Sequence, residues 1–240
     1  MTQIRRRSEI SAREAGRRPG RPEGSTSGDN ASERILDAAE EVFAEVGYSG
    51  ATLRTVAARA DVTQALISYY FGNKYGLYEA VFIRRGRAIA DQRVKLLDEL
   101  KQRNDVTVRD VVKAFLAPTI ALRETRGGRL FLRLQARLHT EPAEISYKLR
   151  NEAYDASTRA YVQMMGRVCP QLSAKDLHWR MVLMIGAYMY AFSDTHRLEQ
   201  IAPEHCNVND TDEVFEQIAA FVSAGISAPP TSGEAAPRDG

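Results

Sequence analysis

Apolar residues recur at helical spacing along most of the chain, whereas strict alternation of apolar and polar residues is scarce. Between residues 31 and 46, for example, Ile35, Leu36, Ala39, Val42 and Phe43 fall on one face of a helix. The same spacing predicts helices over residues 31–46, 53–60, 64–71, 74–101, 106–125, 129–140, 143–168, 174–198 and 210–223. The expected fold class is therefore all-α.

The two ends of the chain have a different composition. Residues 1–29 are rich in Arg, Gly, Pro and Ser without helical periodicity, which predicts a flexible arm, and residues 227–240 predict a disordered tail. The arm holds seven arginines and two acids up to Pro22, although the whole chain carries a net charge of only +2. A basic arm of this kind is typical of a segment that contacts nucleic-acid phosphates; the alternative is a tail that only adds solubility.

Several other classes of protein find no support in the sequence. The two cysteines, Cys169 and Cys206, are far apart, and His178, His196 and His205 lack metal-ligand spacing, so neither a zinc site nor any other cofactor is expected. Nucleotide-binding, metalloprotease and serine-hydrolase motifs are missing, which argues against an enzyme. The sequence has no secretory signal and no apolar run of about 18 residues, so we expect a cytoplasmic protein outside the membrane.

The segment from residue 30 to residue 78 carries the clearest pattern. Asn30 and Glu33 predict a capping box at the start of its first helix, and Gly47 is expected to end that helix. Two short helices follow, with Thr52 and Thr63 as their N-caps. The tight turn between them contains Asp61 at a position that favours a left-handed backbone, which Asp tolerates better than most residues. This arrangement predicts a helix-turn-helix.

The residues of this unit resemble the TetR/AcrR family of bacterial regulators. The resemblance rests on the strings TLRTVA (52–57), ADVT (60–63) and YYFGNKYGLY (69–78). The chain departs from the family pattern at Asp61 and at Ser68, where many members carry Tyr. The resemblance implies a three-helix DNA-binding domain over residues 30–78 and a helical ligand-binding and dimerisation domain over residues 79–226. It also implies a homodimer on a double-stranded DNA operator.

In such motifs the start of the second short helix enters the major groove. There Gln64 can pair with adenine, and Ala65 can touch a thymine methyl group. Ser68 and Tyr69 lie one turn further along, and Arg21 belongs to a Pro-Gly-Arg-Pro stretch that resembles the core of a minor-groove AT-hook. The predicted DNA-binding residues are Thr52, Arg54, Thr55, Thr63, Gln64, Ala65, Ser68, Tyr69, Tyr70, Lys74 and Arg21.

Large apolar side chains along the second half of the chain are candidates for an adaptable binding pocket, because Met and aromatic residues repack easily. The predicted effector-binding residues are Phe115, Phe131, Leu134, Tyr154, Met164, Met165, Trp179, Met184 and Tyr188. Polar candidates for a head group are Arg133, Arg137, His139 and Arg180. For the dimer we expect an apolar seam of Ile185, Gly186, Met189 and Phe192.

The function that these observations favour is a repressor that leaves its operator when a small apolar or amphipathic effector binds. The stretch LHWR (177–180), followed by Gly186 and Ala187, is similar to a branch of the family that responds to fatty acids and acyl-CoAs. That similarity implies a carboxylate or acyl-thioester head group. A transcriptional activator and an architectural DNA-binding protein without an effector are the alternatives.

Overall fold

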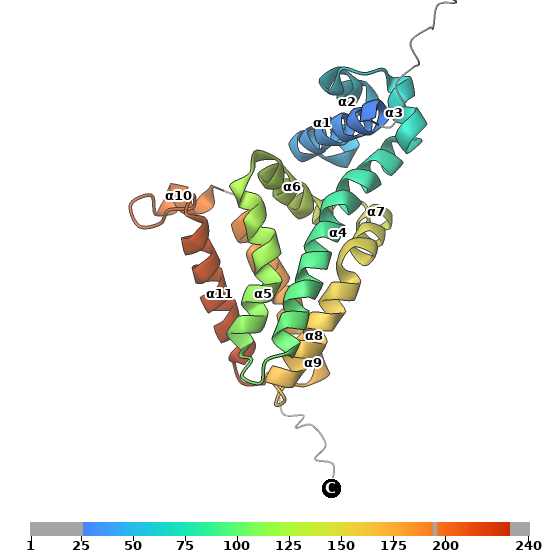
Figure 1. Ribbon diagram of the computed structural model, residues 1–240. Coiled ribbons are helices and arrows are strands. Elements are labelled where there is room, and N and C mark those ends of the chain that lie inside the picture. Colours follow the sequence, from blue (N-terminus) through green and yellow to red (C-terminus); the bar gives the residue numbers. More distant parts are fainter. Residues whose placement is uncertain (1–25, 194–195, 231–240) are drawn as a thin grey trace, which may run out of the picture.

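The computed structural model describes residues 26–193 and 196–230, and every regular element in those ranges is helical (Figure 1). The predicted all-α class is therefore confirmed. Most of the basic arm, including Arg21, and most of the predicted C-terminal tail lie outside the described residues. In the described part of the chain, no helix is both long enough and apolar enough to cross a bilayer.

Three helices form a small head at one end of the molecule: α1 (Thr26–Gly50), α2 (Leu53–Ala60) and α3 (Gln64–Phe71) (Figure 1). The first helix begins earlier than the sequence suggested, so Asn30 lies inside it and is no N-cap. Gly47, with a φ of 72° and a ψ of 178°, is outside the helical region and ends the first helical segment of α1, as predicted, and a short second segment continues to Gly50. Val56, Ala60 and Ile67 of the two short helices are buried.

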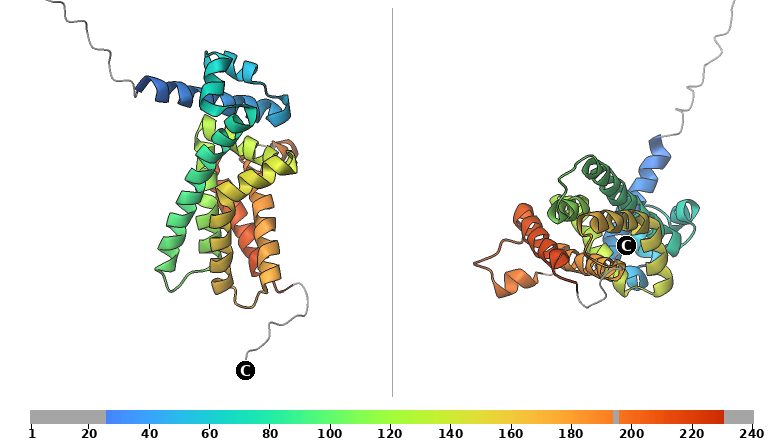
Figure 2. Two further views of the ribbon diagram at one scale, coloured as in Figure 1. Left: turned by 90° about the vertical axis from the view of Figure 1, so that its right-hand side faces the viewer. Right: turned by 90° about the horizontal axis from the view of Figure 1, so that it is seen from below.

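A long helix, α4 (Lys74–Lys101), leaves the head and runs down the length of the body (Figures 1 and 2). Asn73 caps its start by accepting a hydrogen bond of 3.0 Å from the backbone N–H of Gly76. The helix packs against α1 and α3 in the head and, in the body, against α5 (Val108–Ile120), α7 (Ala143–Arg150) and α8 (Ala156–Val168). One rigid element thus contacts both ends of the molecule.

The remaining helices build the body below the head, and α4 runs along one side of it (Figure 2). They are α5 (Val108–Ile120), η1 (Ala121–Glu124), α6 (Arg126–Arg137), η2 (Leu138–Thr140), α7 (Ala143–Arg150), η3 (Asn151–Asp155), α8 (Ala156–Val168), α9 (Ala174–Phe192), α10 (Arg197–Ile201) and α11 (Thr211–Ser227). The predicted helix over residues 143–168 is divided by the π-helical turn η3, and the helix predicted over residues 174–198 ends at Phe192.

Buried apolar side chains form two clusters. One joins α1–α3 to the upper half of α4 and to α6, with Phe43, Tyr78 and Phe131 among its fully buried members. The other lies among α5, α8, α9 and α11 and includes Phe115, Tyr161 and Phe192. The partly buried Leu122 packs against both clusters. Because the head shares its core with α4 and α6, movements of those helices are transmitted to it directly.

Candidate nucleic-acid interface and effector pocket

Side-chain caps and one left-handed residue set the angle between α2 and α3. Thr52 accepts a hydrogen bond of 3.1 Å from the backbone N–H of Thr55, and Thr63 accepts one of 3.2 Å from that of Leu66. Between the helices, Asp61 has a φ of 52° and a ψ of 55°. The left-handed turn predicted from the sequence is therefore present.

Asp61 offers a test of this turn. We expect Asp61→Gly to leave the stability unchanged or slightly higher, because Gly adopts a positive φ without steric cost. Asp61→Val should lower the free energy of unfolding by about 1–2 kcal/mol, since a β-branched residue is strained in that region. Urea denaturation measures both variants. Equal stability of the two would contradict a strained turn.

The first turns of α3 present a row of exposed side chains. Gln64, Ala65, Ser68 and Tyr69 are all exposed, and the Tyr69 side chain is 81% accessible. On the opposite face, Ile67 is fully buried. Helix α3, which carries this row, belongs to the head, at the end of the molecule away from the lower body (Figure 1).

The other predicted DNA-binding residues of the head have mixed surroundings. Thr52, Arg54, Thr55 and Thr63 are exposed beside the α3 row. Tyr70 is only half-buried and packs against the head core, with its ring 5.2 Å from that of Tyr69. These five residues and the α3 row are the candidate DNA-contact residues of the head.

Lys74 occupies a different position from the one we expected. Its Nζ donates to the carbonyl oxygens of Tyr48 and Ala51, at 3.0 and 3.1 Å, and lies over the Tyr48 ring. The ammonium group therefore holds the last turn of α1 and the residue just after it, where carbonyls lack helical partners. In this structure Lys74 positions the head and does not project freely toward a phosphate.

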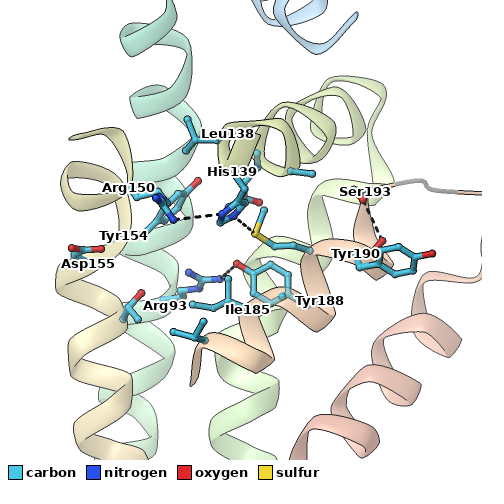
Figure 3. Close-up of a pocket in the computed structure, with 16 residues that line it drawn as sticks. Arg93, Leu138, His139, Arg150, Tyr154, Asp155, Ile185, Tyr188, Tyr190 and Ser193 are labelled. Atoms are coloured by element: carbon cyan, nitrogen blue, oxygen red, sulfur yellow. Dashed lines mark hydrogen bonds between the residues drawn. The ribbon is translucent and has the colours of Figure 1, made fainter. Parts of the chain in front are cut away.

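The body contains a pocket of about 630 Å³ between α4, α6, η2, η3 and α9 (Figure 3). Its size falls within the range of about 300–1,000 Å³ that is usual for small-molecule sites. The lining residues are Arg93, Gln135, Ala136, Leu138, His139, Arg150, Tyr154, Asp155, Thr158, Val182, Ile185, Gly186, Tyr188, Met189, Tyr190 and Ser193.

Only two of the nine predicted effector-binding residues line this pocket, namely Tyr154 and Tyr188. Trp179 is exposed on the outer face of α9. The other six are buried in the two apolar cores and lie away from the pocket lining: Phe115, Phe131, Leu134, Met164, Met165 and Met184. Large apolar residues at helical spacing were mostly ordinary core, because a helix bundle needs such side chains wherever its helices meet.

Of the predicted polar candidates, His139 lines the pocket and the others do not. Its Nε2 lies 3.0 Å from the Met189 sulfur, and its Nδ1 lies 3.5 Å from a guanidinium nitrogen of Arg150. Burial lowers the pKa of His139, and the Arg150 charge lowers it further. Arg180 instead caps the end of α11 by donating to the carbonyls of Ala228 and Pro229, at 2.6 and 2.7 Å.

Sequence reasoning missed Arg93, the most deeply buried charge of the pocket. The residue is 1% exposed and lies on α4, one turn after Ile89 and one turn before Leu97, both of which are buried. A cation at a position that helical periodicity assigns to the core was the signal that could have revealed it.

An apolar stripe follows the outer face of α9. Trp179, Val182, Leu183 and Tyr190 are 60–63% exposed, and Phe221 on the neighbouring α11 is 71% exposed. Gly186 lies within the stripe, and a Cβ atom added at this glycine would meet no other atom within 4 Å, so the helix backbone is open there. The predicted seam was wrong in part, because Met189 and Phe192 are buried within the subunit.

Family models match both halves of the chain. One describes the tetR family of bacterial regulatory proteins and matches residues 35–81, which include α2 and α3. The other describes the C-terminal domain of tetracyclin repressor-like proteins and matches residues 113–225. Together the two matches span more than half of the chain.

Two transcriptional regulators of the BetI type match part of the chain. The HTH-type transcriptional regulator BetI of Paraburkholderia phytofirmans is 37% identical over 75 residues, which are 26% of this chain and 38% of that protein. BetI of Burkholderia thailandensis is 45% identical over 47 residues, or 20% of this chain and 24% of the relative. The matched region thus spans well under half of these relatives.

Solved structures share the whole fold. A TetR-like regulator from Rhodococcus sp. RHA1 aligns with a TM-score of 0.56 at 16% identity over 82% of this chain and 96% of that one. A tetR-family protein from Shewanella sp. PV-4 gives 0.58 at 18% identity over 81% and 97%. With the exposed helix-turn-helix and the two family matches, the chain belongs to the TetR family of DNA-binding transcriptional regulators.

Proposed function

We propose that the protein is a homodimeric repressor that leaves its DNA operator when a small amphipathic molecule fills the pocket beside α4. The observation that carries this proposal is that the pocket and the head share structural elements. Arg93 of the pocket belongs to α4, and the first residues of that helix pack against α3. A ligand that shifts α4 therefore also shifts the DNA-binding surface.

A second connection runs through η2, the short turn that carries Leu138 and His139 of the pocket. On one side of it, Arg137 donates a hydrogen bond of 3.2 Å to the carbonyl of Glu45 in α1. On the other side, Glu141 accepts one of 2.9 Å from the backbone N–H of Tyr48. The turn that borders the pocket therefore also holds the end of α1.

Release requires that the effector prefer one arrangement of the dimer. Two recognition helices bind one operator only when they match major grooves about 34–36 Å apart. An effector that binds more tightly to a dimer with another spacing lowers operator affinity, at most by the ratio of its affinities for the two arrangements. An effector that binds both arrangements equally well does not release the DNA. Fluorescence anisotropy of labelled operator DNA during ligand titration tests the proposal, and DNA that stays bound with a ligand-filled pocket would refute it.

The η2 connection predicts that Glu141→Ala weakens the coupling between ligand and DNA. Ligand affinity should stay unchanged, because Glu141 does not line the pocket. A typical coupling free energy between two sites is about 1–3 kcal/mol. In the variant, the factor by which saturating ligand lowers operator affinity should be several-fold smaller than in the wild type. The matched control is Glu144→Ala, because Glu144 is an exposed residue of α7. Coupling of wild-type strength in Glu141→Ala would exclude this route.

For the DNA surface we expect Gln64→Ala to weaken operator binding by about 1–3 kcal/mol, the value of one bidentate base contact. Binding to unrelated DNA should stay the same, since base contacts contribute only to specific complexes. Arg54→Ala is the comparison, because loss of a phosphate contact lowers affinity for both DNAs and flattens the salt dependence. Parallel losses in the two variants would contradict a base-reading role for Gln64.

A further inference from the structure

We propose that the effector is an organic anion whose carboxylate binds to Arg93. This inference rests on the proposed function, because it names the chemical class of the molecule that fills the same pocket. It is carried by the charge, burial and hydrogen bonds of one arginine and by the composition of the wall around it.

Arg93 is a buried cation without an acidic partner. Its side chain is 1% exposed, and none of the described Asp or Glu side chains forms an ion pair with it. The guanidinium is stabilised by neutral groups: Nε donates to the Phe115 carbonyl at 2.9 Å, and Nη2 donates to the Thr119 hydroxyl at 3.1 Å. It also lies over the Phe115 ring, 3.6 Å from the centroid. Such contacts orient the charge and leave it uncompensated.

The guanidinium still has donors to offer. The third of its hydrogen bonds runs from Nη2 to the Tyr188 hydroxyl at 3.4 Å, and none of the three uses Nη1. Arg93 and Tyr188 both line the pocket, and Figure 3 shows the hydrogen bond between the Arg93 guanidinium and the Tyr188 hydroxyl as a dashed line. A carboxylate placed there would accept charge-assisted hydrogen bonds from the guanidinium and one from the Tyr188 hydroxyl.

The rest of the wall agrees with an anion. Arg150 adds a second cation, next to His139 in the upper part of Figure 3. The single acid of the lining, Asp155, lies 3.7 Å from the guanidinium of Arg159. The pocket therefore presents a net positive charge, which attracts an anion and repels a cation in this poorly solvated setting.

Apolar groups beside these cations indicate the remainder of the molecule. Leu138, Ile185 and Met189 line the same pocket, so a hydrocarbon or aromatic group can be buried while the acid contacts Arg93. A neutral thioester would leave the guanidinium without a counter-charge. The pocket chemistry therefore favours a free carboxylate over a thioester.

A purely structural role for Arg93 makes different predictions. If the side chain only joins α4 to α5 through the Phe115 carbonyl, then its removal lowers stability and changes the affinity for all ligands alike. If it binds an acid, the loss is confined to ligands that carry a negative charge. Ligands with one skeleton and different charges separate these cases.

The experiment is calorimetry with octanoate and 4-phenylbutyrate, each compared with its amide and with the corresponding amine. For the wild-type protein we expect both acids to bind at least tenfold more tightly than their amides, and the amines to bind weakest. Arg93→Met should weaken acid binding at least tenfold and leave amide binding unchanged. Arg87→Met, an exposed position on the same helix, is the matched control and should behave as wild type.

Circular dichroism checks that each variant folds. If Arg93→Met does not fold, two other measurements test the proposal. One is the order of the wild-type affinities for acid, amide and amine. The other is Tyr188→Phe, which should weaken the binding of the acids only. Tighter binding of amides or amines, or failure of both acids to bind at millimolar concentration, overturns the anion proposal. The operator-release assay distinguishes failure of the anion proposal from failure of the proposed function. Release of DNA by neutral or cationic probes alone refutes the anion proposal. Binding of a ligand in the pocket without any release of DNA refutes the proposed function.

Discussion

A Glu40→Ala variant is expected to lose about 3 kcal/mol of stability, because it breaks a buried ion-pair network between α1 and α4. The Glu40 side chain is 3% exposed and lies 3.0 Å from a guanidinium nitrogen of Arg84 and 3.1 Å from one of Arg85. Removing one member of a buried pair costs about 3–5 kcal/mol, since the charge left behind has lost its compensation. We expect the lower end, because the two arginines are 21% and 33% exposed and can reach water.

Asp37 provides the matched control, as it contacts the same Arg84 at 2.9 Å but is 68% exposed. Burial alone would lower the pKa of Arg84, yet the hydrogen bonds that Arg84 donates to the carboxylates of Glu40 and Asp37 raise it overall. Exposed ion pairs contribute only about 0–1 kcal/mol, so Asp37→Ala should be nearly neutral. Urea denaturation at neutral pH compares the two. A loss below about 1 kcal/mol in Glu40→Ala would mean that the network adds nothing beyond a surface pair.

The head could be predicted in detail because its structure is determined by short-range chemistry. Thr52 and Thr63 cap their helices and Asp61 adopts the left-handed turn, each through interactions within a few residues of the chain. The bounds predicted for α2, α3 and α4 agree with the structure for the same reason. The start of α1 was wrong, because the Asn30–Glu33 capping pattern did not stop the helix from extending to Thr26.

The pocket could not be predicted, because it depends on which faces of distant helices meet. Met164 and Met184 have the composition of a pocket wall but pack into the lower core, whereas Arg93 and Arg150 line the actual pocket. Lys74 shows the same limit on a smaller scale. Its charge and position suggested a phosphate contact, but the carbonyls that it binds lie at the end of α1, more than twenty residues earlier in the sequence.

The apolar stripe on α9 leads to the prediction with the largest expected effect on function. Trp179, Leu183 and Tyr190 expose more than half of their surface on one face, and Gly186 opens the backbone between them. A groove of about 260 Å³ beside the stripe is lined by Leu183, Ala187 and Phe221. An apolar surface of this kind is unfavourable in water, and self-association of two copies about a twofold axis would bury it.

Gly186→Arg should therefore turn the protein into a monomer. Operator affinity should fall by more than about 100-fold, because a single head binds one half-site and loses the gain in affinity that comes from binding two half-sites at once. The charged side chain would be forced into the centre of an apolar contact, where an unpaired cation is costly. Binding of one isolated half-site, measured without effector because Gly186 also lines the pocket, should stay unchanged, since the head packs mainly against α4 and α6. Val94→Glu, which alters an exposed apolar residue on α4, is the control and should leave both the dimer and the operator affinity intact. Analytical ultracentrifugation and anisotropy on full operator and half-site DNA measure both quantities. A Gly186→Arg protein that remains dimeric at operator-binding concentrations would show that the two copies meet elsewhere.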